Sequence, residues 1–490
     1  MPTTLNTNTS QWSMVILGVT PSSARIWVGT LFPTLKMPNE ARVEITDHAG
    51  NRQSKTIGKA DWRRPFRKLN QRFYTIMEFN GLKPGTRYEV DFSRYVDYIG
   101  KRSDYYWQSL KDGTFDTLPL SLSGPGEKPF TVGFGSCFYN HRDGGQAAGA
   151  YRALYERGPE HDRPDISFLT GDQVYLDIGF DSLSLIPSEI RQRIAHDYAL
   201  HWQTLGSILT RGGTWMLPDD HEYWNDYPFY DSLIPTLLAL KLRIVREAWS
   251  EAALDGVLRV QNTPIVESFT IGNDLSFCLV DARSYRAKKH FLEPAAFDKL
   301  LTWARSLTCP GVLVLSQPLI VNQEMERNLR SFPADYNRLI EALGSTPHDI
   351  VLLSGDVHFG RISQVRLGDH GGRLIEVISS PLSNLTGLNG IATAAPEFRP
   401  KIFPESAGFS TWQPQPVTYN KDFAVSTRPG WPDSDYPRVR TVEHFMTAGF
   451  RKDHVGQVEM VVNAWQVRNR EPPNNTPVRD LKVPFQITLN

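Results

Sequence analysis

Four stretches of the sequence end an apolar run on side chains that can bind a cation or transfer a proton. They are "FTVGFGSC", ending at Cys137; "ISFLTGDQVYLD", with Asp172, Tyr175 and Asp177; "TWMLPDDHEYWND", with Asp219, Asp220, His221 and Glu222; and "IVLLSGDVHFG", with Asp356 and His358. Thiolate, phenolate, carboxylate and imidazole are all metal ligands. If the four runs are strands of one open α/β sheet, their carboxyl ends gather along one edge, and residues far apart in sequence form one site.

Each of these short motifs also has an ordinary structural interpretation. A Gly-Asp pair after a strand is commonly a turn or a helix cap, and a lone histidine or tyrosine is commonly a hydrogen-bonded core residue. A lone cysteine is more often a small buried hydrophobe, as we interpret Cys278, or a loop thiol, as we interpret Cys309 beside Pro310. The repetition of the same event at four strand ends is what favours a site.

The elements that must position these residues form an α/β core. The runs "PFTVGFGS", "ISFLTGD", "SFCLVDAR", "GVLVLSQ" and "IVLLSGD" predict strands covered on both faces. Residues 188–205 repeat an apolar residue every four positions, and 236–254 are rich in helix formers, so both predict helices. The terminal segments 456–468 and 481–490 return to strand-like alternation and are expected to complete a sheet.

The first hundred or so residues differ from the rest because their apolar side chains alternate, as in "SARIWVGT", "ARVEITDHAGN" and "TRYEVDF". With the Pro84-Gly85 turn, this pattern resembles a fibronectin type III or immunoglobulin-like sandwich. We predict an N-terminal β-sandwich domain over 1–118, a linker over 119–129 rich in Pro, Gly and Ser, and a second domain over 130–490. Within it, 385–450 is expected to form a lid or rim.

Composition limits the choice of partners. The 490 residues hold 53 Lys plus Arg and 53 Asp plus Glu, so no long-range positive field favours nucleic acid or an anionic membrane. The longest apolar stretches are too short and too charged to span a bilayer. The three cysteines do not suggest a disulfide framework, and the segment after Met1 lacks export features, so we expect a cytoplasmic protein acting on a small ligand. The oligomeric state is left open.

The set GSC, GDxxY, DDHE and GDxH, in this order, resembles the PhoD-like (alkaline phosphatase D-like) branch of the binuclear metallophosphatases, which are related to the purple acid phosphatases. "VDARSYR" (280–286) and "VLSQPL" (314–319) are also similar to that family. The resemblance implies an α/β fold, a four-layer αββα calcineurin-like sandwich, preceded here by the all-β domain. It also implies a metal-dependent hydrolase of phosphoric esters. Relatives are commonly exported, whereas this chain shows no export signal.

The resemblance further implies a ligand set for two cations, which sit about 3.5–4 Å apart in such sites and clamp a phosphoryl group. Asp172 would bridge the pair. The first metal, Fe³⁺, would take Cys137, Tyr175 and His358, since phenolate requires a strong Lewis acid to lose its proton near neutrality. The second metal, Ca²⁺ or otherwise Mn²⁺ or Mg²⁺, would take the oxygen ligands Asp220 and Asp356.

For catalysis, the resemblance implies that a metal-bound hydroxide attacks phosphorus while His221 assists the leaving group, with Asp172 as the bridging catalytic carboxylate. Glu222 and Asn225 are candidates for orienting the ligands, and Asn225, Arg283 and Arg286 are candidates for substrate binding, although at least one arginine is expected to pair with a structural carboxylate. Asp177 is either a surface residue or a ligand of an additional cation. Other functions that fit the same sequence are a phospholipase- or nucleotide-type phosphodiesterase and a non-catalytic binding protein.

Overall fold

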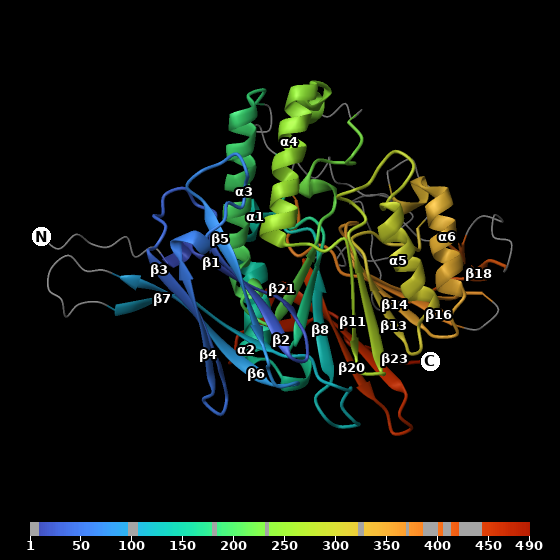
Figure 1. Ribbon diagram of the computed structural model, residues 1–490. Helices are drawn as coiled ribbons and strands as arrows, with labels where there is room; N and C mark the ends of the chain where they lie inside the picture. The colour runs from blue at the N-terminus through green and yellow to red at the C-terminus, as the bar shows by residue number, and fades with distance from the viewer. Residues whose placement is uncertain are drawn as a thin grey trace, which may run out of the picture.

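The computed structural model describes residues 9–96, 106–178, 184–230, 235–321, 328–368, 372–385, 400–404, 413–420 and 443–490. Two mixed β-sheets face each other at the centre of the described part, and helices cover their outer faces (Figure 1). Two smaller sheets precede them in sequence. The predicted α/β sandwich behind an all-β N-terminal region is therefore confirmed.

The first central sheet, sheet I, has the strand order β10-β9-β8-β20-β21-β22, and β23 also pairs with β21. The first three strands in this order run parallel, while β20 and the strands beyond it are antiparallel. Its members are β8 (Phe130–Gly135), β9 (Ile166–Thr170), β10 (Gly213–Leu217), β20 (His444–Lys452), β21 (Val458–Glu471), β22 (Thr476–Arg479) and β23 (Phe485–Leu489).

The second central sheet, sheet II, has the order β11-β12-β13-β14-β16-β15-β19, with parallel pairing from β12 to β16. Its members are β11 (Val266–Ile271), β12 (Leu275–Val280), β13 (Gly311–Val314), β14 (Ile350–Ser354), β15 (Arg361–Arg366), β16 (Arg373–Ile378) and β19 (Thr418–Tyr419). The short strands β17 (Ile402–Phe403) and β18 (Gln415–Pro416) pair with each other.

The continuous apolar runs conceal a strict alternation of side chains between two cores. In β14, Val351 and Leu353 join the core between the two sheets, whereas Ile350 and Leu352 join the core beneath the outer helices. The same division separates Phe277 from Cys278 in β12, so Cys278 is the buried hydrophobe that we predicted. A strand covered on both faces needs apolar residues at every position, which is why these runs show no period of two in the sequence.

Helices close the outer faces of both sheets (Figure 1). The helices that cover sheet I contribute to one outer hydrophobic core. Helices α5 and α6, which cover sheet II, contribute to a second outer core. The α-helices are α1 (Asn140–Asp143), α2 (Gln146–Arg157), α3 (Pro187–Leu209), α4 (Arg243–Asp255), α5 (Pro294–Arg305) and α6 (Pro333–Gly344). The 3-10 turns are η1 (Thr9–Gln11), η2 (Lys59–Asp61), η3 (Glu160–Asp162), η5 (Asp220–Glu222), η6 (Pro235–Lys241) and η8 (Leu329–Ser331), and η7 (Gly256–Gln261) is a π-helical turn.

The N-terminal region consists of a sheet in the order β1-β2-β5 and a sheet in the order β4-β3-β6-β7. The strands are β1 (Ser13–Val19), β2 (Ser23–Thr30), β3 (Glu40–Asp47), β4 (Arg52–Gly58), β5 (Phe73–Asn80), β6 (Arg87–Val96) and β7 (Tyr106–Asp116). Strand β3 alternates between buried and half-buried positions, as predicted. Strand β2 instead buries both faces at its end, because Trp27 packs into the core beneath α3 and α4. The domain boundary at 119–129 stays a proposal.

Two predictions about elements need correction. The continuous helix expected over 236–254 is wrong, since Leu242 has extended backbone and separates η6 from α4. Most of the segment 385–450 lies outside the described residues, but a lid or rim is wrong for its last part. Residues 444–450 belong to β20, which lies inside sheet I between β8 and β21. Helix α3 covers the predicted range 188–205 and buries its four-residue repeat.

Candidate metal centre

The loops that leave β8, β9 and β14 are joined to one another directly after their strands end. The backbone amides of Cys137 and Phe138 donate to the carbonyls of Gly171 and Asp172 over 3.1 and 2.8 Å. From sheet II, the amide of Asp356 donates to Oγ of Ser136 over 3.2 Å. The carboxyl ends of strands from both sheets therefore meet at one place, as the sequence motifs predicted.

Three overlapping groups of potential metal ligands lie at this junction in the described part of the chain. Within each group the ligand atoms are no more than 4.8 Å apart. The groups are Cys137, Asp172 and His358; Asp172, Asp220 and His221; and Asp219, Asp220 and Asp356. Asp172 belongs to the first two groups and Asp220 to the last two, so each can contact neighbouring cations. The structure brings every predicted carboxylate, thiol and imidazole ligand into one cluster.

Tyr175 lies at the edge of the same cluster. Its hydroxyl oxygen is 3.4 Å from Nε2 of His358, and its ring centroid is 4.4 Å from that of His221. The pKa of its hydroxyl is raised well above the ordinary value by burial and by Cys137 and Asp172. A phenolate ligand at this position therefore requires a strongly charged cation beside it.

Close approach of the strand-end loops requires a glycine before the aspartate in both Gly-Asp motifs. A Cβ atom on Gly355 would lie 2.1 Å from Oγ of Ser136, and a Cβ on Gly171 would lie 2.7 Å from Cβ of Asp219. Gly171 also has a positive φ of 101°. These glycines allow loops from different strands to approach within contact distance, which is the physical reason that Gly precedes Asp here.

The ligand-bearing residues hold an unusual backbone conformation. Cys137, Asp172, Asp356 and His358 all have φ between 55° and 69°, in the left-handed region that residues with a Cβ rarely adopt. Such conformations cost free energy and persist where the surrounding structure enforces them, which is common at functional sites. These conformations direct Cys137, Asp172 and His358 into one ligand group and Asp356 into the group at the other end of the cluster.

The electrostatics of the cluster fit cation binding. Burial, together with neighbouring acidic groups, raises the pKa of Asp172 and of Asp356 well above 3.8 and the pKa of the Cys137 thiol to about 12. Among the residues that the structure describes, Oδ2 of Asp219 and Oδ1 of Asp220 are buried without a hydrogen-bond partner. Buried carboxylate oxygens without a donor are costly unless a cation compensates them, so the residues present fit a metal centre.

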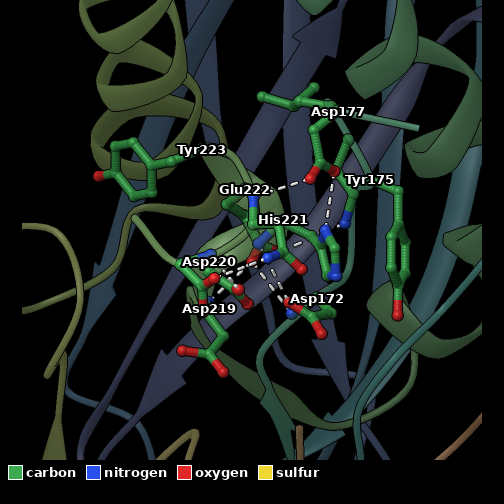
Figure 2. A network of polar contacts seen from close by, with 12 residues as sticks. Asp172, Tyr175, Asp177, Asp219, Asp220, His221, Glu222 and Tyr223 are labelled. Atoms are coloured by element: carbon green, nitrogen blue, oxygen red, sulfur yellow. Dashed lines mark hydrogen bonds and ion pairs between the residues drawn. The ribbon is translucent and has the colours of Figure 1, made fainter. Parts of the chain in front are cut away.

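His221 lies between Asp177 and Asp172 (Figure 2). Its Nδ1 is 2.7 Å from Oδ1 of Asp177, whose other oxygen accepts the amide of Asn225 over 2.7 Å. Burial alone would lower the pKa of His221, but Asp177, Asp220 and Asp172 together raise it well above 6.5. Since Asp177 is only 2% exposed, the surface interpretation of this residue is wrong. Its hydrogen bonds instead orient His221.

Glu222 connects the two loops that carry most of the acidic ligands. Its carboxylate accepts the backbone amides of Asp172 and Asp219 over 3.0 and 2.8 Å, and that of Gln173 over 2.6 Å. Burial raises the pKa of Glu222 to about 8, although these amides act in the opposite direction. A single carboxylate therefore fixes the loop after β9 against the loop after β10, in the orienting position that we expected for this residue.

The residues predicted to bind substrate differ in how they are engaged. Arg283 is 1% exposed and directs Nε and Nη2 to Oδ1 of Asp219 over 2.6 and 2.5 Å. Its contacts favour a structural ion pair, the alternative that we expected for at least one arginine. Arg286 donates to Gln317 over 2.7 Å, and Gln317 in turn donates to Asp356 over 3.0 Å. The side chain of the half-buried Asn225 donates to Asp226 over 2.9 Å. Substrate contact by these three residues stays a prediction.

Sequence reasoning missed the loop formed by residues 379–384, "SSPLSN". Ser380 contacts Cys137, and Asn384 contacts His358. Serine and asparagine are common in loops, and this stretch does not end an apolar run on a titratable side chain. A signal of the kind that revealed the other loops was therefore absent here.

Comparison with solved structures identifies the fold. The chain matches a structure described as that of PhoD with a TM-score of 0.56 and 15% identity, covering 96% of this chain and 91% of that one. It matches the purple acid phosphatase PPD1 from yellow lupin (Lupinus luteus) seeds with a TM-score of 0.54 and 12% identity, covering 98% of this chain and 74% of that one. No family model matches the sequence, and neither does any curated protein.

The chain therefore has a metallophosphatase fold, an αββα sandwich with an all-β N-terminal region. Within that class, its fold is PhoD-like, as the sequence motifs indicated. Of the helices in the described segments, none combines the length and the apolar character that crossing a bilayer would require.

Proposed function

We propose that this protein is a metal-dependent hydrolase of phosphoric esters, a phosphatase or phosphodiesterase. The observation that carries the proposal is the convergence of four strand-end loops into overlapping ligand groups that share Asp172 and Asp220. Shared carboxylates are what a pair of closely spaced cations requires, and such pairs act on phosphoryl groups. The metallophosphatase fold supports the same function.

The donor sets differ at the two ends of the cluster. Cys137, Tyr175 and His358, with Asp172, would hold the first cation, and this mixture of sulfur, phenolate and imidazole suits Fe³⁺. Asp220 and Asp356, again with Asp172, would hold the second, and an all-oxygen set suits Ca²⁺, or Mn²⁺ or Mg²⁺. Asp219 adds a buried, unpartnered oxygen at this second end. When bound, the cations supply Lewis acidity toward phosphoryl oxygens and toward a water molecule.

We assign to His221 the role of protonating the leaving alcohol. Asp177 holds Nδ1, so Nε2 is the nitrogen left for the centre, and Asp177, Asp220 and Asp172 raise the pKa of the ring and so favour its protonated form. An imidazolium fixed in this way can stabilise a phosphoryl oxygen and give its proton to the departing oxygen. Arg283 neutralises Asp219 and thereby keeps the loop after β10 in place.

The direct test is metal analysis of the purified protein combined with hydrolysis of p-nitrophenyl phosphate and bis-p-nitrophenyl phosphate. We expect bound metal, hydrolysis of at least one of the two esters, loss of hydrolysis after chelation, and recovery when metal is restored. The ratio of the two rates separates monoesterase from diesterase activity. Metal-loaded protein that hydrolyses neither ester would favour the non-catalytic alternative.

A variant test addresses the proposed acid. His221→Ala should retain the metal content of the wild-type protein and lose turnover by about 10²-fold or more, since general acid catalysis contributes on that scale. Tyr175→Phe serves as the comparison at the first metal. It should remove a visible tyrosinate-to-iron absorption band. Full activity of His221→Ala would remove His221 from the mechanism.

A further inference from the structure

The loop of residues 379–384, which we term the cradle loop, follows β16 and runs beside the segment that carries Cys137. The carbonyl of Ser379 accepts the amide of Ser136 over 3.1 Å, and the amides of Leu382 and Ser383 donate to the carbonyls of Ser136 and Cys137 over 2.8 and 3.1 Å. The loop is buried at Ser379, Ser380 and Ser383. Its backbone is therefore fixed against the first end of the candidate centre.

Ser380 connects two of the proposed ligands of the first cation. Its hydroxyl donates to Sγ of Cys137 over 3.1 Å and accepts the backbone amide of His358 over 3.1 Å. Cys137 and His358 lie in loops that follow strands of different sheets, β8 and β14, and both have positive φ, at 58° and 55°. A single hydroxyl that contacts both residues helps to hold two strained conformations in one arrangement.

Asn384 acts on the side chain of His358. Its Oδ1 lies 3.0 Å from Nδ1 of the imidazole. With the proton on Nδ1, this contact is a hydrogen bond that leaves Nε2, the nitrogen 3.4 Å from the Tyr175 hydroxyl, as the lone pair available to a cation. Metal-bound histidines are commonly oriented in this way by a partner on the other ring nitrogen.

Asn384 is itself anchored from the C-terminal strands. Its backbone amide donates to Glu443 over 2.9 Å, and Arg468 in β21 forms an ion pair with the same carboxylate. Glu443 is buried. Asn384 is thus held at two points: its side chain contacts His358, and its backbone amide contacts Glu443.

We propose that Ser380 and Asn384 are positioning residues for the first cation: Ser380 stabilises the Cys137 thiolate, and Asn384 holds His358 with Nε2 free to bind. The inference rests on the proposed function, because it requires Cys137 and His358 to be ligands. Hydrogen bonds from such neighbours typically change metal affinity by about 10–100-fold and alter the electronic state of a metal-bound sulfur.

The test uses Co²⁺ as a spectroscopic probe on the full chain after chelation, so its result does not depend on hydrolysis or on which metal the protein carries naturally. Co²⁺ bound by a thiolate gives a near-ultraviolet sulfur-to-cobalt band. We expect Ser380→Ala and Asn384→Leu to raise the Kd for Co²⁺ by about 10–100-fold, and Ser380→Ala also to displace the band. Asn384→Asp keeps the acceptor oxygen and should bind Co²⁺ as the wild-type protein does.

The matched control is Ser383→Ala. Ser383 is in the same loop and is equally buried, but its hydroxyl donates to the backbone carbonyl of Tyr139 over 3.1 Å instead of contacting a ligand side chain. It should leave the Kd and the band unchanged. If Ser380→Ala does not fold, the comparison of Asn384→Leu with Asn384→Asp still decides the question.

The failures are distinguishable. A sulfur-to-cobalt band that is present and unchanged in Ser380→Ala, with wild-type affinity in Asn384→Leu, would overturn the positioning roles and leave the proposed function intact. Equal weakening in Ser383→Ala would also overturn them, because the effect would then come from general loosening of the loop. Absence of the band in the wild-type protein would remove Cys137 as a ligand and with it the proposed centre.

Discussion

His221 and Asp177 illustrate how much chemistry depends on single residues. Both are buried, and the 2.7 Å contact between Nδ1 and the carboxylate places a negative charge beside the imidazole on the side away from Asp172. Burial opposes protonation of the ring, and the three surrounding carboxylates outweigh that effect. The pKa of His221 is therefore set by its neighbours, and Asp177 is the first of them.

Removing the charge of Asp177 should shift the pH dependence of turnover. The proton-donating form of His221 exists below its pKa and is lost as pH rises through it. Asp177→Asn removes the charge that most raises this pKa, so activity should disappear at a lower pH, and turnover should fall by about 10–100-fold. The measurement is kcat/KM against pH at equal metal content. A profile that coincides with that of the wild-type protein would exclude an orienting role for Asp177.

Residues of the candidate site were predictable from the sequence where a titratable side chain closely followed an apolar run. Cys137, Asp172, Asp220, Asp356 and His358 satisfy that condition, and the structure brings them together. Asp177 lies at the end of a motif that was recognised, but its contact with His221 depends on how two loops fold over one another. Ser380 and Asn384 follow β16 with no such signal, so only their spatial position shows what they contact.

The arrangement of the candidate site depends on how closely the ends of neighbouring strands approach one another. β8, β9 and β10 are adjacent parallel strands of sheet I, and the loop after β14 reaches them from sheet II through the contact of Asp356 with Ser136. Glu222 then fixes the loop after β10 against the loop after β9. The site is thus a property of loops held by two sheets, and none of the strands holds it alone.

Substitution of Gly355 tests this close approach. The added Cβ of Gly355→Ala would lie 2.1 Å from Oγ and 2.3 Å from Cβ of Ser136, so the two loops must separate. We expect a loss of about 1–3 kcal/mol in the free energy of unfolding, measured with urea, and reduced metal content. Gly206→Ala in α3 is the control. A Cβ there meets nothing within 4 Å, and the change should be neutral or stabilise the protein by about 0.5–1 kcal/mol.

Strand positions were predictable because buried strands of two facing sheets need continuous apolar residues. The boundary between η6 and α4 was not, because "ALKLRIV" contains neither Gly nor Pro to mark a helix end. The break at Leu242 is stabilised by a side-chain hydrogen bond across it, in which Arg246 donates to the carbonyl of Leu240 over 2.8 Å. β20 was missed because it follows a Pro-rich segment, and its buried residues become a strand only through pairing with β8 and β21.

For the molecule as a whole, the buried acidic cluster makes stability depend on both pH and bound cations. Burial raises the pKa of Asp172 and of Asp356 well above 3.8, so the folded chain keeps protons that the unfolded chain releases. The stability that each carboxyl contributes is present below its ordinary pKa and is lost as pH rises toward the folded value, at up to about 1.4 kcal/mol per pH unit.

Chelated protein should therefore become less stable as pH rises above the ordinary aspartate pKa of about 4, whereas metal-loaded protein should change much less, because cations replace the protons. Thermal unfolding of both forms across this range measures the difference. A Tm of the chelated form that stays constant or rises with pH would contradict the raised pKa of Asp172 and Asp356 in the folded protein.

The N-terminal β-sandwich shares its packing with the rest of the chain. Val15, Leu17 and Trp27 enter the core that also holds α3 and α4, and Nε1 of Trp27 donates to the carbonyl of Arg259 over 2.9 Å. Helix α3 in turn sends Arg193 to the carbonyl of Leu176, next to the centre. The N-terminal sheets consequently support the loops of the candidate centre from behind α3, and replacing them would expose the apolar core that they share with α3 and α4. Substitutions in this region should therefore be tolerated best on its outward side, such as β4, whose side chains from Arg52 to Thr56 face water.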